Sequence, residues 1–274
     1  MNAIPLAFYA VAMVVYGWHF ARRNPRVGRA ATTVLIFGAL AHTFVIGMQT
    51  MEFGHMPVAG ATSAISTFVW LLVLSYLHLE LTTDERAMGV FILPLVVALQ
   101  TIPAMKSSVE ASSEVLKGPL FGVHVSSLLF AYASFALACM IGITYVLQFK
   151  EIKAKHLGFF YTRLPSLQAL DRMNHVAIVI GWIFLTVGLI VGFVWAQQAR
   201  GYAAGSPQVQ AMSLGDPKIL VAVVCWVVYS FELFAARLIG WGGRKTAYLS
   251  LIGFSIVMFN FVAIGYFMTK SHNF

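Results

Sequence analysis

The chain has 274 residues, of which 59% are hydrophobic and 10% are charged, and its mean hydropathy is +0.81. A soluble domain carries about 25% charged residues, so this chain has too few polar side chains to cover a water-facing surface. The composition excludes a soluble enzyme, a disordered chain and a nucleic-acid-binding module. The formal net charge is +8, and the positions of the basic residues decide what that charge means.

Long apolar runs follow one another along the whole chain. A membrane-spanning helix needs about 20 mainly apolar residues. The sequence predicts eight such segments, at roughly 3–20, 31–50, 63–81, 87–105, 119–149, 175–197, 219–239 and 247–269. The fifth is longer than a bilayer requires, so we expect it to tilt or to extend into water. The predicted fold class is an all-α integral membrane protein, a single polytopic domain over residues 1–274 built as a bundle of eight transmembrane helices.

The basic residues are distributed unevenly between the two sides of this predicted bundle. Thirteen of the 18 lysines and arginines lie in or beside the loops after the first, third, fifth and seventh segments, and five lie on the other side. Cytoplasmic loops carry the excess of Lys and Arg, so we expect both termini to be extracytoplasmic. This distribution accounts for the positive net charge of a protein in the lipid bilayer, so the charge does not require a nucleic-acid partner.

Histidines are the main candidates for chemistry, because polar groups at membrane depth mark functional sites. On the predicted topology His42, His55, His124 and His272 lie in or near the outer half. His124 is in the first turns of the fifth segment, and His272 follows the last segment at the same level. Two imidazoles held at one depth by different helices are what a bis-histidine iron site requires. The alternative for each is a hydrogen-bonded anchor at the interface.

Two polar residues lie deeper in the predicted segments. His42, in the second segment, needs either a hydrogen-bond partner on another helix or a ligand, and the sequence leaves both open. Glu232, in the seventh segment, is expected to pair with a neighbouring polar group or to extend toward Arg237. The alternative for Glu232 is a proton or cation site.

Other patterns carry less chemistry. Gly188 and Gly192 form a Gly-x-x-x-Gly pattern in the sixth segment, which close helix packing explains. The two cysteines lie in apolar runs, and the chain has no Cys-x-x-Cys-His motif, which excludes a disulfide scaffold and a covalently attached haem. In the basic loop 150–174, Pro165 and Ser166 could begin a helix that lies on the membrane face.

Four stretches of the sequence are similar to those of a known family. They are MPVAGATSAISTFVWLLVLSYLHLE, GVHVSSLLFAYASFALACMIGITYVLQ, GDPKILVAVVCWVVYSFELFAAR and the final SHNF. Together they cover the third, fifth and seventh segments and the end of the chain. The chain resembles the haem-handling cytochrome c assembly proteins of the CcsA/CcmC type, and within them the eight-span HemX-like branch.

The resemblance implies a set of ligands for haem. His124 and His272 would be the axial ligands of the iron on the outer side, and His42 a haem ligand within the membrane. Asp216 matches the Asp-Pro that ends the family's tryptophan-rich loop, where this chain has Tyr202 and no tryptophan. The implied cofactor is a non-covalently bound b-type haem.

Two cations flank the same loop. Arg200 precedes it and Lys218 follows it, so both are candidates for pairing with the haem propionates. The alternative for each is a solvated loop charge, since exposed ion pairs contribute only about 0–1 kcal/mol.

The expected function is haem transport and presentation in cytochrome c biogenesis, in the bacterial cytoplasmic (inner) membrane. An apocytochrome c or a second cytochrome c assembly membrane protein is the expected partner, and whether the chain is part of a haem-attachment (cytochrome c synthase) system is left open. The alternative is a HemX-like, non-enzymatic regulator of haem biosynthesis that acts through loop 150–174. Neutralising the charges of that loop should then abolish regulation and spare haem binding.

Two further classes fit the sequence less well. An electron-transfer subunit would need paired histidines in the same helices, and only His42 and His124 approach that pattern. A transporter would need helices broken near the midplane, for which Pro94 and Pro103 are the candidates.

Overall fold

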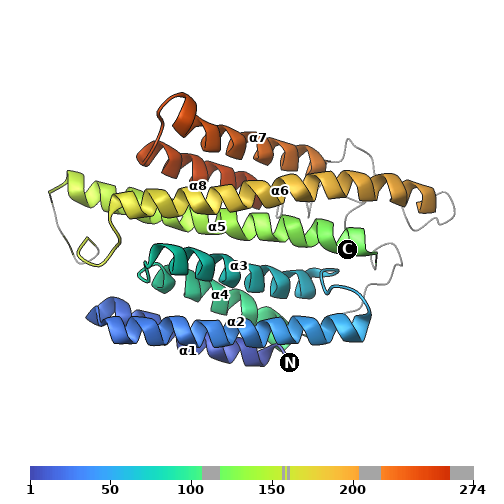
Figure 1. Cartoon of the computed structure of the whole chain (residues 1–274), viewed down its shortest axis with the longest axis horizontal. Helices are drawn as coiled ribbons and strands as arrows, with labels where there is room; N and C mark the ends of the chain where they lie inside the picture. Colours follow the sequence, from blue (N-terminus) through green and yellow to red (C-terminus); the bar gives the residue numbers. More distant parts are fainter. Residues whose placement is uncertain (107–117, 156–157, 159–160, 204–216, 260–274) are drawn as a thin grey trace.

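The protein is described by a computed structural model that covers residues 1–106, 118–155, 158, 161–203 and 217–259. These residues form eight helices and no strand: α1 (Ala3–Arg22), α2 (Pro25–Phe53), α3 (Ala61–Thr83), α4 (Gly89–Met105), α5 (Pro119–Lys153), α6 (Leu167–Ala203), α7 (Pro217–Leu238) and α8 (Arg244–Phe259). Figure 1 shows the helices side by side along one direction. The all-α prediction is confirmed for this part of the chain, and the eight helices fit the predicted membrane bundle.

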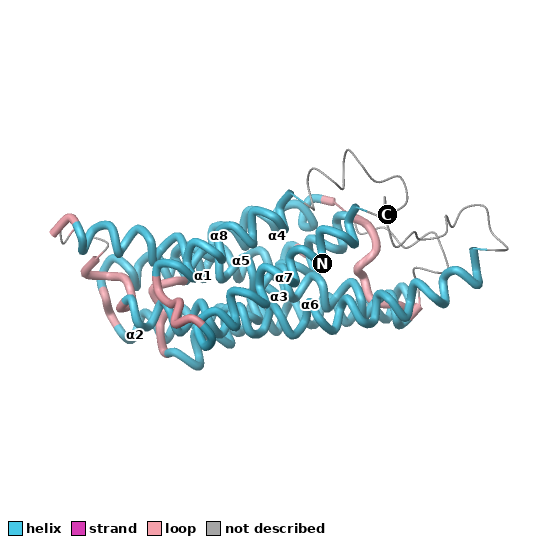
Figure 2. The backbone as a smooth tube through the Cα atoms, turned by 90° about the horizontal axis from the view of Figure 1, so that it is seen from above, coloured by secondary structure: helices cyan, strands magenta, loops and turns pink. Residues whose placement is uncertain are grey.

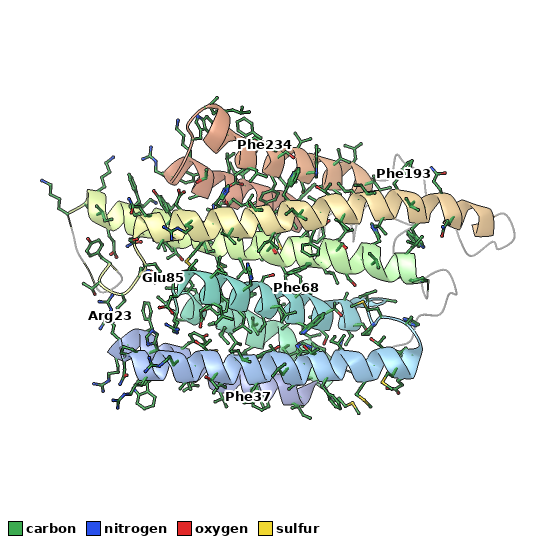
Figure 3. All side chains as sticks on the ribbon, in the orientation of Figure 1. Arg23, Phe37, Phe68, Glu85, Phe193 and Phe234 are labelled. Carbon is green, nitrogen blue, oxygen red and sulfur yellow. The ribbon has the colours of Figure 1, made fainter. Side chains whose placement is uncertain are left out.

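The outer surface of the bundle is apolar. Among the described residues, α1, α2, α3, α5 and most of α6 are long and apolar enough to cross a bilayer, while α4 and most of α7 are shorter apolar helices. The side chains of Phe37, Phe193 and Phe234 point away from the bundle in Figure 3, and Phe37 is 56% exposed. Large apolar groups that face outward along whole helices require lipid rather than water. The chain is therefore a multi-pass membrane protein.

Local sequence explains where several helices begin and end. Asn24 accepts a hydrogen bond from the Arg26 amide at 2.9 Å, and Pro25 occupies the first turn of α2. Gly54, with φ of 70°, ends α2 in the left-handed conformation. Pro119 begins α5, whose 35 residues span about 52 Å. This length exceeds the hydrocarbon thickness of about 30 Å, as the long fifth segment predicts.

The start of α6 differs from the prediction. Ser166 does cap a helix, since its Oγ accepts from the Ala169 amide at 3.1 Å. However, this segment is the first turns of α6 itself and not a separate helix on the membrane face. No Pro or Gly lies between Leu167 and Ile180, so nothing interrupts the helix. Asn174 in these turns also bonds to α8 and holds them in the bundle.

The helices pack as two four-helix halves, α1–α4 and α5–α8, which occupy the lower and upper parts of Figure 1. In each half the first and third helices both pack against the second and the fourth. Helix α3 packs against α5 and joins the halves, and their hydroxyls on Ser75 and Ser134 lie 3.4 Å apart. The buried apolar side chains of the two halves form one continuous core, and each half contains a buried polar cluster of its own.

The described turns lie at the two ends of the bundle, as Figure 2 shows. We name the end that carries the α1–α2, α3–α4, α5–α6 and α7–α8 connections the arginine-rich end. Arg23 and Glu85 mark it in Figure 3. The opposite end, where α1 begins and α2 and α4 end, is named the N-terminal end. This alternation is the one that the predicted spans require.

Helix α4 is continuous although it contains prolines. Pro94 lies inside the helix, which runs from Gly89 to Met105. The broken helix that a transporter would need is therefore not found at Pro94.

Candidate functional site

The imidazole of His124 lies in a slot on α6 at the N-terminal end. Its Nδ1 donates to the carbonyl oxygen of Gly188 at 2.8 Å. A Cβ placed on Gly192 would lie 2.5 Å from the same nitrogen, so only a glycine leaves room for the ring. The Gly-x-x-x-Gly pattern, which the sequence explains by packing alone, therefore accommodates a functional side chain.

Aromatic rings flank this slot. Trp195 stacks on the His124 ring, with centroids 6.0 Å apart and planes 21° from parallel. Phe121 also contacts the Trp195 ring, with centroids 5.1 Å apart. Both aromatic side chains are buried, while His124 is half-buried. The imidazole thus lies at the edge of an apolar, aromatic wall between α5 and α6.

This arrangement suits a metal-binding histidine. A neutral imidazole that donates from Nδ1 carries its lone pair on Nε2. Metal-binding histidines in proteins almost always donate their other ring nitrogen to a carbonyl or carboxylate, which fixes the ring and raises its basicity as a ligand. The bond from His124 to the Gly188 carbonyl has the same geometry. The slot, the fixed nitrogen and the aromatic wall fit a flat, apolar iron porphyrin.

The other predicted contacts of this site are only partly described. His272 and Asp216 lie outside the described residues. Arg200 and Lys218 lie in the last turn of α6 and the first turn of α7, and only their backbone is described. Figure 1 shows both of these helix ends at the end of the bundle where α5 begins, which is the end that holds His124. The ligand and propionate-binding roles of these four residues stay predictions.

His42 is wholly buried and contacts two other helices. Its Nδ1 lies 3.0 Å from the hydroxyl of Tyr9 on α1, and its Nε2 lies 3.0 Å from the hydroxyl of Ser66 on α3. Both ring nitrogens are therefore engaged, and the ring joins α1, α2 and α3. This geometry is that of a helix–helix hydrogen-bond anchor, while the haem-ligand role of His42 stays a prediction.

The sequence assigns no function to a further histidine at the N-terminal end. His55 donates from Nδ1 to the Met56 carbonyl at 3.0 Å, and its Nε2 is buried without a hydrogen-bond partner among the described residues. Met56 contacts α5, with its sulfur 3.2 Å from the Ser126 hydroxyl. The loop that carries His55 thus packs against the first turns of α5, close to His124 in sequence. The sequence signal for His55 is its position directly after Gly54, a glycine that turns the chain.

A second candidate site is a groove of about 400 Å³ at the arginine-rich end. It lies between the α1–α2 turn, the α3–α4 loop and the segment before α6, and Arg23, Arg86 and Arg163 line it. Arg163 donates to two backbone carbonyls at the end of α1. Partial burial, together with the neighbouring Asp84 carboxylate, raises the pKa of Glu85 in the same groove, and the Arg86 guanidinium opposes this shift. The groove therefore presents groups of both charges at the rim of the bundle.

Comparisons with known proteins identify the family of the chain. The family model described as "Cytochrome C assembly protein" matches residues 3–272. The chain is 25% identical over 259 residues to "Cytochrome c biogenesis protein CcsA" of Guillardia theta, covering 87% of this chain and 83% of that protein. It is also 25% identical over 270 residues to "Protein HemX" of Bacillus subtilis (strain 168), covering 97% of this chain and 94% of that protein. Because the family model matches nearly the whole chain, the protein belongs to the cytochrome c assembly protein family.

Proposed function

We propose that the protein handles haem in cytochrome c biogenesis, and that His124 and His272 hold the haem iron at the N-terminal end of the bundle. The observation that carries this proposal is the His124 imidazole, placed in the slot between Gly188 and Gly192 with its Nδ1 bonded to a carbonyl. His272 is included as the second ligand because its position is similar to that of the family's second outer histidine. The relatives named as cytochrome c biogenesis proteins support the assignment.

The residues of the chain would bind and orient the cofactor. Haem, when bound, supplies an iron that takes up and releases an electron and vinyl groups that react with thiols. His124 would bind the iron through Nε2, with its ring held in place by the bond from Nδ1 to the Gly188 carbonyl. Trp195 excludes water from one side of the imidazole. Arg200 and Lys218 pair with the two propionates, which are anionic.

The proposal includes an orientation in the membrane. We place the arginine-rich end in the cytoplasm, since Lys and Arg are retained on that side. The haem site is then extracytoplasmic, on a single domain of residues 1–274 in a bacterial cytoplasmic (inner) membrane. There it would present a non-covalently bound b-type haem to an apocytochrome c or to a second assembly protein, with Asp216 at the end of the covering loop.

An optical spectrum of the purified full-length protein tests the proposal. Two imidazoles on one iron give a six-coordinate, low-spin haem, so we expect that spectrum for the unchanged protein supplied with haem. His124→Ala and His272→Ala should each abolish it, because one axial ligand is lost. His175→Ala is the matched control, since this exposed histidine lies on α6 toward the arginine-rich end. If both ligand variants keep an unchanged spectrum, the assignment is wrong.

His42 provides a separate prediction. We expect His42→Ala to lower the stability by about 1–3 kcal/mol, because it leaves the Tyr9 and Ser66 hydroxyls without their partner and opens a cavity. The low-spin haem spectrum should remain. Thermal unfolding in detergent and the spectrum measure the two effects on one sample. If His42→Ala loses the haem spectrum and keeps its stability, His42 is instead a haem ligand.

The groove at the arginine-rich end favours a second function. A regulator would need a surface outside the membrane for a protein partner, and the groove with Arg23, Arg86 and Arg163 offers one. Relatives named HemX align over nearly the whole chain. Neutralising the charges of loop 150–174 separates the two functions, because it should abolish regulation and spare the haem spectrum, whereas His124→Ala and His272→Ala should abolish the spectrum.

A further inference from the structure

The second half of the bundle encloses a buried carboxyl group. Glu232 on α7 is 2% exposed. Its Oε1 accepts from the hydroxyl of Ser250 on α8 at 2.6 Å, and that hydroxyl accepts from the Asn174 amide on α6 at 2.9 Å. Its Oε2 has no hydrogen-bond partner among the described residues. The proposed haem site lies at the other end of the same half, so it does not use this group.

The first half contains a buried glutamate for comparison, also on its third helix and near the arginine-rich end. Both carboxyl oxygens of Glu80 accept hydrogen bonds, from the hydroxyls of Tyr16 and Thr32. The Arg86 guanidinium lies 4.0 Å away. Glu232 has no ion pair with any described Lys, Arg or His. Two glutamates at matching places in the two halves therefore differ in their described partners. Glu80 has a cation nearby and two bonded oxygens, while Glu232 has one bonded oxygen and no cation among the described side chains.

A line of polar groups leads from the arginine-rich end to Glu232. Asp171 on α6 accepts from the Gly243 amide at 2.9 Å and lies 3.4 Å from the Thr246 hydroxyl, which also bonds to the Gly243 carbonyl at 2.8 Å. The Ser250 hydroxyl, one turn further along α8, lies 3.2 Å from the Thr246 carbonyl and contacts Glu232. Thr246 and Ser250 are four residues apart, so they lie on one face of α8, and Gly243 immediately precedes that helix. We name Asp171, Thr246, Ser250 and Asn174 the polar ladder.

The other ionisable groups around this site lie off the ladder. Arg244 lies over the Phe149 ring at 5.2 Å and Lys245 over the Trp241 ring at 4.7 Å. Other titratable side chains nearby are Tyr145 and Cys139 on α5, the exposed Arg172 and His175 on α6, and Tyr229 and Cys225 on α7. The side chain of Arg237, toward which the sequence allows Glu232 to extend, lies outside the described part of the chain. The Tyr229 hydroxyl is buried one turn deeper than Glu232, without a described partner. No cation among the described residues therefore balances a negative charge on Glu232.

We infer that Glu232 is a proton-binding site, loaded from the arginine-rich end along the polar ladder. An ionised carboxylate buried without a cation loses its hydration and gains no counter-charge. Binding one proton at Oε2 removes the negative charge, and releasing it restores the carboxylate, so that the exchange involves one proton and no other group. The hydroxyls and amide of the ladder bring donors and acceptors to the buried carboxyl. This inference does not depend on haem binding.

Infrared difference spectroscopy of the full-length protein in liposomes tests this inference. The spectrum of the unchanged protein minus that of Glu232→Gln should contain the C=O stretching band of a protonated carboxylic acid. That band should move to lower frequency in D2O. Glu80→Gln is the matched control, and it should remove carboxylate bands and no protonated C=O band. A Glu232→Gln difference that contains only carboxylate bands would overturn the inference.

Two variants keep the buried acid in place. Ser250→Ala should shift the C=O band upward, because the hydrogen bond at Oε1 is lost, and this identifies the band even if Glu232→Gln fails to fold. Thr246→Val keeps the shape of its side chain and removes a ladder hydroxyl. It should leave the band in place and slow its shift in D2O several-fold. A band in the unchanged protein that never shifts in D2O would overturn loading from the aqueous side.

Discussion

Gly192→Ala is expected to weaken haem binding about 10–100-fold, which is the usual effect of disturbing a group that orients a metal-binding histidine. The added Cβ would lie 2.5 Å from Nδ1 of His124, much closer than two such atoms can approach. The imidazole must then turn out of its slot and lose the 2.8 Å hydrogen bond to the Gly188 carbonyl. Haem titration followed by absorbance measures the change.

Gly47→Ala is the matched control for this substitution. Gly47 also lies within an apolar helix, α2, and a Cβ placed there meets no atom within 4 Å. It adds the same methyl group to a spanning helix, so haem affinity should not change. If Gly192→Ala folds and binds haem as tightly as the control, the slot is not the site of the iron ligand.

Glu80→Ala is expected to cost about 3–5 kcal/mol of stability, the range for removing one partner of a buried charged pair. The carboxylate receives hydrogen bonds from Tyr16 and Thr32 and lies 4.0 Å from Arg86. Its removal leaves the Tyr16 hydroxyl without its acceptor. Thr32 and Arg86 each lose one partner, while Thr32 keeps the Gly28 carbonyl at 3.1 Å and Arg86 keeps the Asp84 carboxylate at 2.8 Å. In a chain of this size the loss corresponds to a fall in Tm of roughly 6–20 °C.

The neighbouring glutamate provides the control for Glu80. Glu85→Ala alters a half-buried carboxyl at the same end of the bundle that receives no comparable set of hydrogen bonds. We expect its effect on Tm to be small, as for an exposed charge. Equal Tm values for the two variants in detergent would show that the Glu80 cluster does not hold α1, α2 and α3 together.

The sequence predicts the helices well because lipid leaves few alternatives. Every backbone polar group within a bilayer must be paired inside the protein, so a long apolar run becomes a helix. The predicted segment 119–149 lies within α5, and 87–105 nearly coincides with α4. The helix that Pro165 and Ser166 predict is the beginning of α6, and its continuity with the predicted segment 175–197 is what the sequence does not reveal. Asp171 bonds to Gly243 and Asn174 bonds to Ser250, contacts with a distant segment that no local pattern shows.

The candidate site was predictable in its residue types and not in its geometry. His124 stands out as a histidine in an apolar run, and similarity to a family adds His272. The pairing of the His124 ring with Gly188 and Gly192 could not be derived, because these residues are 64 or more positions apart in sequence. His42 shows the same limit, since the sequence leaves its partner open and the structure provides Tyr9 and Ser66.

The sequence alone thus determined that this chain is a helical membrane protein with most of its basic residues at one end and four of its eight histidines in the opposite half. Those properties follow from the amino-acid composition and from the order of residues along the chain, which together determine which stretches are apolar and which are charged. Only the tertiary structure decided that Glu80 has a cation beside it and Glu232 has none among the described residues. Helical periodicity places a side chain on a face, but its chemistry depends on which distant helix packs against that face.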